Sequence, residues 1–121
     1  MAYTIETIIA EKFESIISKN ITTTRAKDFY DLYMLMNKHK NDINNRNIVK
    51  AIENTFNKRN TEFNIDNFKE IVEILEDSNV LKRVFTDYQS KLEYTKEVSF
   101  DDTIKAINII IGILESELVE V

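Results

Sequence analysis

The amino-acid sequence contains one glycine and no proline in 121 residues. Tight hairpins between β-strands depend on residues that adopt positive φ angles, and glycine does so most readily. A chain that offers little beyond asparagine for such turns is poorly suited to a β-sheet. The sequence therefore predicts an all-α fold.

Hydrophobic periodicity predicts about six helices packed as an irregular bundle. They are expected at about 4–19, 25–38, 46–59, 66–77, 80–92 and 99–118. Thr4 and Asp66 are expected N-caps, residues 99–102 resemble a capping box, and Gly112 is expected at a close contact between helices. No repeat or flexible linker divides the chain, so residues 1–121 are expected to form a single domain.

Composition excludes several classes of protein. The chain has no cysteine, which removes disulfide scaffolds, zinc–cysteine clusters and thiol catalysis. The longest apolar run, 109–114, is too short for a membrane span, and residues 1–4 do not resemble a secretory signal. We therefore expect a cytoplasmic protein with no membrane partner.

The net charge of −5 argues against a domain that binds nucleic acid with its whole surface. The stretch 38–59 is nevertheless basic. It holds six basic residues (Lys38, Lys40, Arg46, Lys50, Lys58, Arg59) and two acidic ones (Asp42, Glu53). This stretch is either an ordinary solvated surface or a patch that contacts RNA.

Lys12 stands where the helical period calls for an apolar residue. At about 100° per residue, Lys12 falls inside the stripe formed by Ile8, Ile9 and Ile16. Its ammonium group either extends along the apolar surface to water, pairs with a buried carboxylate, or faces a cleft that receives an anion.

Asp28 and Asp31 lie on one face of the second predicted helix, beside Leu32 and Leu35. Two carboxylates so close could hold a divalent metal or act as a base and its partner. The alternative is structural, since acidic residues stabilise a helix N-terminus and Lys27 with Asp31 forms an i,i+4 pair. His39, the single histidine, lies in a charged run without a second ligand, so it is expected at the surface and no metal site is predicted from it.

Two segments resemble a known family. Residues 3–16 (YTIETIIAEKFESI) contain Ala10-Glu11-Lys12, and residues 24–33 (TRAKDFYDLY) contain Arg25, Lys27, Asp28, Asp31 and Leu32. These segments are similar to the Ala-Glu-Lys-Leu and Arg-x-Lys-Asp-x-x-Asp-Leu motifs of the AbiEii/AbiGii toxin family of nucleotidyltransferases. Residues 51–61 resemble the family's next helix more loosely, and beyond residue 63 only the helical pattern agrees.

The resemblance implies a toxin of a toxin–antitoxin or abortive-infection pair. Such enzymes move a nucleotide from a triphosphate onto an acceptor such as a tRNA 3′ end, and the complete enzyme is expected to use Mg²⁺ and a nucleoside triphosphate. The resemblance places Lys12 and Asp28 in the catalytic site, with Arg25, Lys27, Asp31 and Glu11 as supporting or nucleotide-binding residues. Lys12 would contact the triphosphate, while Asp28 would orient Lys12 or assist proton removal.

The family's N-terminal half, a polymerase-β-like core with a metal-binding Asp-x-Asp strand, has no counterpart in these residues. The chain thus resembles the helical C-terminal domain alone, and we expect it to be inactive and without cofactor by itself: an excised piece, a truncated gene product or half of a split protein. The alternative is a non-catalytic helical module that binds an antitoxin or self-associates.

Overall fold

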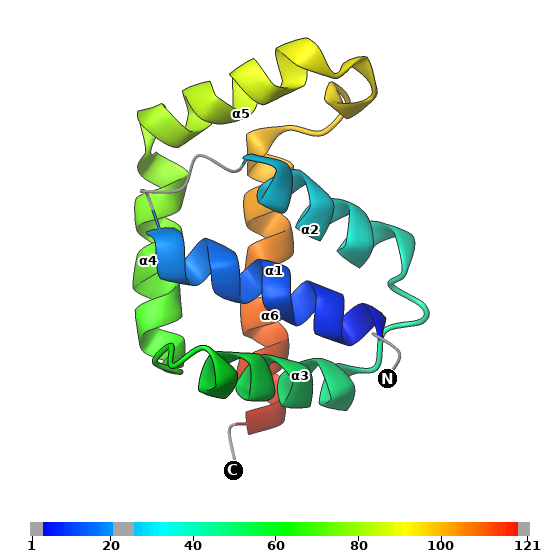
Figure 1. Ribbon diagram of the computed structural model, residues 1–121, viewed down its shortest axis with the longest axis vertical. Helices are drawn as coiled ribbons and strands as arrows, with labels where there is room; N and C mark the ends of the chain where they lie inside the picture. The colour runs from blue at the N-terminus through cyan, green and yellow to red at the C-terminus, as the bar shows by residue number, and fades with distance from the viewer. Residues whose placement is uncertain (1–3, 21–25, 119–121) are drawn as a thin grey trace.

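The computed structural model describes residues 4–20 and 26–118 (Figure 1). Within these ranges the structure defines six α-helices and a short 3₁₀ helix, η2. Their bounds are α1 Ile5–Lys19, α2 Ala26–Lys38, α3 Asn45–Lys58, α4 Ile65–Asp77, α5 Asn79–Lys91, η2 Glu93–Thr95 and α6 Phe100–Leu118. The described ranges contain no strand, so the predicted all-α class and the number of helices are confirmed.

Helix α1 crosses the middle of the molecule, with α6 running behind it at a steep angle (Figure 1). Helix α3 lies below α1 and runs in the same direction, while α2 lies above it. The most extensive helix–helix contacts are those of α1 with α3, α1 with α2, α2 with α6, and α4 with α6. Because α1 has neighbours on both sides, polar side chains on either edge of this helix meet another element.

Two groups of aromatic rings lie in a core that is otherwise largely aliphatic. In the first, Phe13 of α1 packs with ring centroids 5.5 Å from Phe68 of α4 and 5.9 Å from Phe56 of α3. In the second, Phe100 of α6 lies 5.9 Å from Phe29 of α2 and 5.8 Å from Phe85 of α5. Tilted and edge-on rings at these distances add specific geometry to the burial of apolar surface. The rings thus fix how α1 and α2, which carry the candidate site, sit on the rest of the molecule.

Side-chain caps set the helix starts. The Thr4 hydroxyl accepts a hydrogen bond from the Thr7 amide at 3.1 Å, as predicted. The predicted capping box also forms, because Ser99 and Asp102 each accept from the other's amide at 3.0 Å. The prediction for α4 is wrong: Asn64 is its cap, accepting from the Asn67 amide, and Asp66 lies in the first turn.

Gly112 does not make the predicted close contact. It is exposed on α6, and a Cβ built at this position would have no atom within 4 Å. The glycine reflects neither a tight helix crossing nor a positive φ angle.

Helix α3 ends in a turn that needs a positive φ angle, and asparagine supplies it. Asn60 has φ 56°, the Asn60 amide donates to the Asn57 carbonyl, and the Thr61 amide donates to the Phe56 carbonyl. This is the Schellman arrangement, usually built on glycine. The turn directs Thr61 back toward α1.

Two carboxylates of α1 bind the two ends of α3. The Glu6 carboxylate accepts a hydrogen bond from the Asn44 amide at 3.1 Å, at the N-terminus of α3. The buried Glu14 accepts from Arg59 at 2.6 Å and from the Thr61 hydroxyl at 2.5 Å, at its C-terminus. These contacts fix α3 along α1.

Candidate functional site

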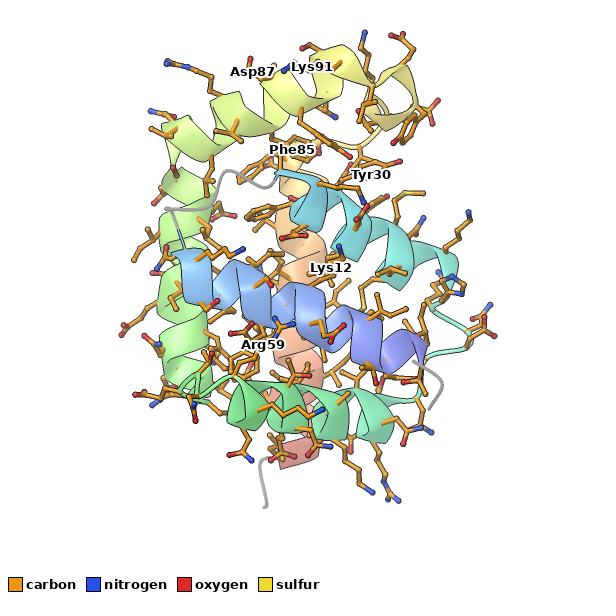
Figure 2. The ribbon with its side chains drawn as sticks, in the orientation of Figure 1. Lys12, Tyr30, Arg59, Phe85, Asp87 and Lys91 are labelled. Atoms are coloured by element: carbon orange, nitrogen blue, oxygen red, sulfur yellow. The ribbon has the colours of Figure 1, made fainter. Side chains whose placement is uncertain are left out.

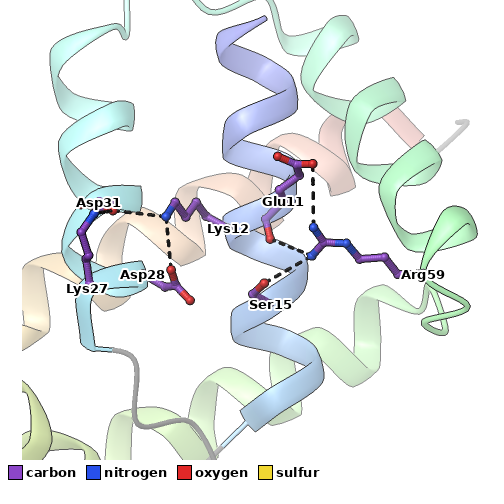
Figure 3. A network of polar contacts seen from close by, with 7 residues as sticks. All are labelled: Glu11, Lys12, Ser15, Lys27, Asp28, Asp31 and Arg59. Carbon is purple, nitrogen blue, oxygen red and sulfur yellow. Dashed lines mark hydrogen bonds and ion pairs between the residues drawn. The ribbon is translucent and has the colours of Figure 1, made fainter. Parts of the chain in front are cut away.

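Lys12 extends from α1 toward α2 and meets two carboxylates there (Figure 3). Its ammonium nitrogen Nζ lies 3.3 Å from Asp28 Oδ1 and 3.2 Å from Asp31 Oδ2. The spacing of three residues on α2 places both carboxylates on the same side of that helix. Of the three fates open to Lys12, the structure shows pairing with carboxylates.

The three side chains differ in their access to water. The side chain of Asp28 is only 6% exposed, whereas those of Lys12 and Asp31 are 24% and 22% exposed. A buried carboxylate is costly unless a counter-ion or hydrogen-bond donor reaches it. Asp28 therefore holds the inner side of the Lys12 ammonium group, while the outer side remains near the surface.

Lys27 is the fourth charged residue of the cluster and pairs with Asp31 on the solvent side. Its ammonium group donates to Asp31 at 2.6 Å, the i,i+4 pair predicted from the sequence. This hydrogen bond and the charge of Asp31 raise the pKa of Lys27 above its ordinary value. Two lysines and two aspartates balance in charge, so the cluster itself carries none.

The cluster opens into a groove between α1, α2 and η2. The groove has a volume of about 530 Å³ and is lined by Ile8, Lys12, Tyr30, Asp31, Met34, Leu35, Lys38, His39 and Tyr94. Its volume falls within the range of roughly 300–1,000 Å³ typical of small-molecule sites. Apolar walls with a few charged groups, among them Lys12, Asp31 and Lys38, suit a small ligand that is partly apolar and partly charged.

The aspartate pair does not fit a divalent metal. Such ions take several oxygen ligands, and here the Lys12 ammonium group lies within 3.3 Å of both carboxylates, where a cation would have to bind. Within residues 4–20 and 26–118, no group of three or more acidic, histidine or cysteine side chains is arranged to hold a metal. We therefore assign no metal-binding role to Asp28 and Asp31.

Glu11 lies on the other side of α1 from Lys12 (Figure 3). Its carboxylate is 3.8 Å from Arg59, which also pairs with Glu14 and donates to Ser15 Oγ at 3.3 Å. The structure thus separates Glu11 from Lys12, Lys27, Asp28 and Asp31, which it brings together. Arg25, the remaining candidate, lies outside the described residues.

The basic stretch 38–59 does not present all its charges freely. Arg59 is bound to Glu14 and Glu11, and Figure 2 shows it turned toward α1. His39 is partly exposed, as expected, with Nδ1 3.6 Å from an Asp42 carboxylate oxygen. Lys38 faces the groove, while Arg46 and Lys50 are exposed on α3.

The sequence did not single out the two tyrosines of the groove. Tyr30 of α2 is buried, and burial together with nearby Tyr94 and Asp31 raises its pKa. Tyr94 of η2 is 67% exposed. The sequence does show an aromatic residue just after the helix predicted at 80–92. Periodicity alone, however, does not indicate where the side chain of such a residue lies.

None of the helices in the described residues is both long enough and apolar enough to span a bilayer.

Residues 1–106 match a protein-family model described as nucleotidyl transferase AbiEii toxin, type IV TA system. The matched range includes α1 to α5 and the first turns of α6, and so the whole groove. Neither the curated proteins nor the solved structures gave a match to this chain.

Proposed function

Because the chain belongs to the AbiEii family of nucleotidyl transferase toxins, we propose that it helps to move a nucleotide from a nucleoside triphosphate to an acceptor. In this proposal Lys12 contacts the phosphates in the groove, and Asp28 orients Lys12. Asp31 and Lys27 support the pair from the outer side. One observation carries the proposal: the Lys12 ammonium group is held between two carboxylates at the wall of a groove large enough for a nucleotide.

The physical argument is one of positioning. Phosphoryl transfer is accelerated mainly by charged groups fixed where negative charge develops. A lysine on a flexible stem loses rotamer entropy when it binds an anion, and a carboxylate that already holds it reduces that loss. The buried Asp28 suits this task because packing restricts its own movement.

We further propose that the carboxylates which hold Mg²⁺ come from a polymerase-β-like half outside the 121 residues. Two-metal transfer requires carboxylates free of competing cations, and Asp28 and Asp31 both contact Lys12. The chain would then act as the helical C-terminal domain and be inactive alone. A tRNA 3′ end as acceptor, an antitoxin partner and a cytoplasmic setting belong to the same proposal.

Calorimetric titration of the chain with a nucleoside triphosphate tests the role of Lys12. We expect Lys12→Ala to weaken binding about tenfold or more, since a hydrogen bond to a charged group contributes about 1.5–3 kcal/mol. Lys69→Ala is the matched control, because Lys69 is also ion-paired, with Glu115, but lies away from the groove. Equal affinities for the two variants would contradict the proposal.

A transfer assay tests whether the chain needs a second half to be active. The chain is incubated with labelled triphosphates, Mg²⁺ and total tRNA, and we expect no incorporation. Clear incorporation by the chain alone would show that it carries a complete site.

A separate observation favours a second function, that of an interaction module. A groove of about 310 Å³ between α2 and α6 is bordered by Ile109, whose side chain is 56% exposed. Exposed apolar surface of this kind promotes association. Light scattering at high concentration tests self-association: Ile109→Lys should abolish it, and a strictly monomeric wild-type chain would rule it out.

A further inference from the structure

Tyr94 combines exposure with a fixed position. Its side chain is 67% exposed, although it lines the same groove as Lys12. Among the described residues, the other large apolar side chains with such exposure are Ile74, Val80 and Ile109, and none of these lines this groove. Tyr94 therefore offers an aromatic surface next to the charged cluster.

The segment that carries Tyr94 is held in place by α5. The Gln89 side-chain amide of α5 donates to the Thr95 carbonyl at 2.8 Å and also to the Val98 carbonyl. Thr95 is fully buried, and its hydroxyl donates to the Leu92 carbonyl at 2.6 Å. The backbone on either side of Tyr94 is thus fixed by hydrogen bonds and burial.

The ring of Tyr94 also has a packing partner. Its centroid lies 6.0 Å from that of Tyr30, with the two rings at 69°, an edge-on contact. Tyr30 is itself buried, with 7% of its surface exposed, and its ring centroid lies 6.2 Å from that of Tyr88. A T-shaped contact engages at most one face of the Tyr94 ring, and the 67% exposure of Tyr94 leaves ring surface for another planar group.

We propose that Tyr94 stacks on the base of the nucleotide whose phosphates Lys12 contacts. The inference rests on the proposed function and assigns the other end of the same ligand. A nucleotide has an anionic end and a flat aromatic end, and the groove supplies an ammonium group from α1 and an aromatic ring from η2. Since every base has a π-face, stacking on Tyr94 favours nucleotides over bare phosphates without selecting one base.

Titration with three probes separates the two ends of the ligand. The probes are ATP, CTP and inorganic tripolyphosphate, each titrated into the full chain and its variants by calorimetry. We expect Tyr94→Ala to weaken ATP and CTP binding about tenfold and to leave tripolyphosphate binding unchanged, because only the nucleotides carry a base. Tyr94→Phe keeps the ring and should bind all three probes like the wild type.

Two further variants complete the experiment. Val80→Ala removes an equally exposed apolar side chain that lines neither groove and should change none of the affinities. Lys12→Ala should weaken the binding of all three probes, whereas Tyr94→Ala should weaken the binding of the two nucleotides only. Because Tyr94 is mostly exposed, its truncation should leave the circular dichroism spectrum unchanged.

The outcomes distinguish the two proposals. If Tyr94→Ala binds the nucleotides as tightly as the wild type, the stacking role is overturned. The same holds if Tyr94→Ala weakens tripolyphosphate binding as much as nucleotide binding. Neither result bears on Lys12. A loss in Tyr94→Ala with no loss in Lys12→Ala retains the stacking role and overturns the proposed role of Lys12. A wild-type chain that binds none of the three probes overturns both.

Discussion

At the residue scale, Lys12 is one of the groups that hold Asp28 in the interior. We expect Lys12→Met to lower the free energy of unfolding by about 2 kcal/mol, because it removes a charged partner of a nearly buried carboxylate. Lys12→Met combined with Asp28→Asn should recover part of this loss, since the charge is then removed as well. Urea unfolding of the two single variants and the double variant measures the coupling. Strictly additive losses would show that the pair contributes no interaction energy.

Tyr88 makes stability depend on alkaline pH. Burial, and then the charges of Tyr94 and Asp31, raises the pKa of Tyr88 from 10.0 to about 12. Between these values the unfolded chain has released a proton that the folded chain keeps, so the free energy of unfolding falls as pH rises. The stabilisation is complete below the unfolded value and is lost as pH rises through the folded value.

Tyr88→Phe removes this titration. We expect its free energy of unfolding to fall less steeply than that of the wild type above about pH 10. Urea midpoints measured at neutral pH and at two alkaline values provide the comparison. Parallel pH profiles for the two proteins would assign the alkaline loss to other groups, such as the lysines.

The proximity of Lys12 to Asp28 could be anticipated, whereas the place of Tyr94 could not. Lys12 interrupts an apolar stripe, and Asp28 lies beside apolar surface one helix later, so both positions carry a local signal. Tyr94 reaches the groove because η2 turns the chain back from α5 toward α2. That turn depends on contacts between residues distant in sequence, which periodicity does not encode.

At the element scale, Gly112 weakens α6 without a structural reason. It lies in the middle of a helix, is exposed, and has no atom near the position of a Cβ. Alanine restricts the unfolded chain and has the higher helix propensity. We expect Gly112→Ala to raise the free energy of unfolding by about 0.5–1 kcal/mol, measured by urea unfolding. A loss of stability would mean that a partner packs against this face.

The start of α4 shows the limit of local signals. Asn64 and Asp66 are both good N-cap residues, and the sequence alone favoured the wrong one. The cap is the residue that keeps an extended backbone, and this is Asn64, with φ −147° and ψ 110°. The following residue, Ile65, packs against the core and is the first residue of α4. The helix therefore begins one residue before Asp66. At Thr4 and at Ser99 the predicted caps are confirmed.

At the scale of the whole molecule, the two aromatic groups belong to one continuous core. The described tyrosines all lie on α2, α5 and η2, and the chain has no tryptophan. In a Tyr3→Phe chain, which keeps only these four tyrosines, fluorescence therefore reports on that end of the molecule, while far-ultraviolet circular dichroism reports on every helix. We expect both signals to give the same urea midpoint, as in a two-state transition.

A variant at the opposite end makes this test sharper. Phe56→Leu alters the aromatic group of α1, α3 and α4 and should destabilise the protein by about 1–3 kcal/mol. We expect it to shift the fluorescence midpoint and the circular dichroism midpoint equally. A fluorescence midpoint that stays unchanged would show that the two ends unfold independently.

Since Glu6 and Glu14 bind opposite ends of α3, the length of α1 between them sets the distance between the two anchoring points of α3. Their offset of eight positions in the sequence corresponds to about 12 Å along the helix axis. One extra residue in this interval would rotate one carboxylate by about 100° relative to the other, and α3 could then be anchored at only one end. Substitutions between these positions leave this spacing intact, whereas an insertion or a deletion there changes it.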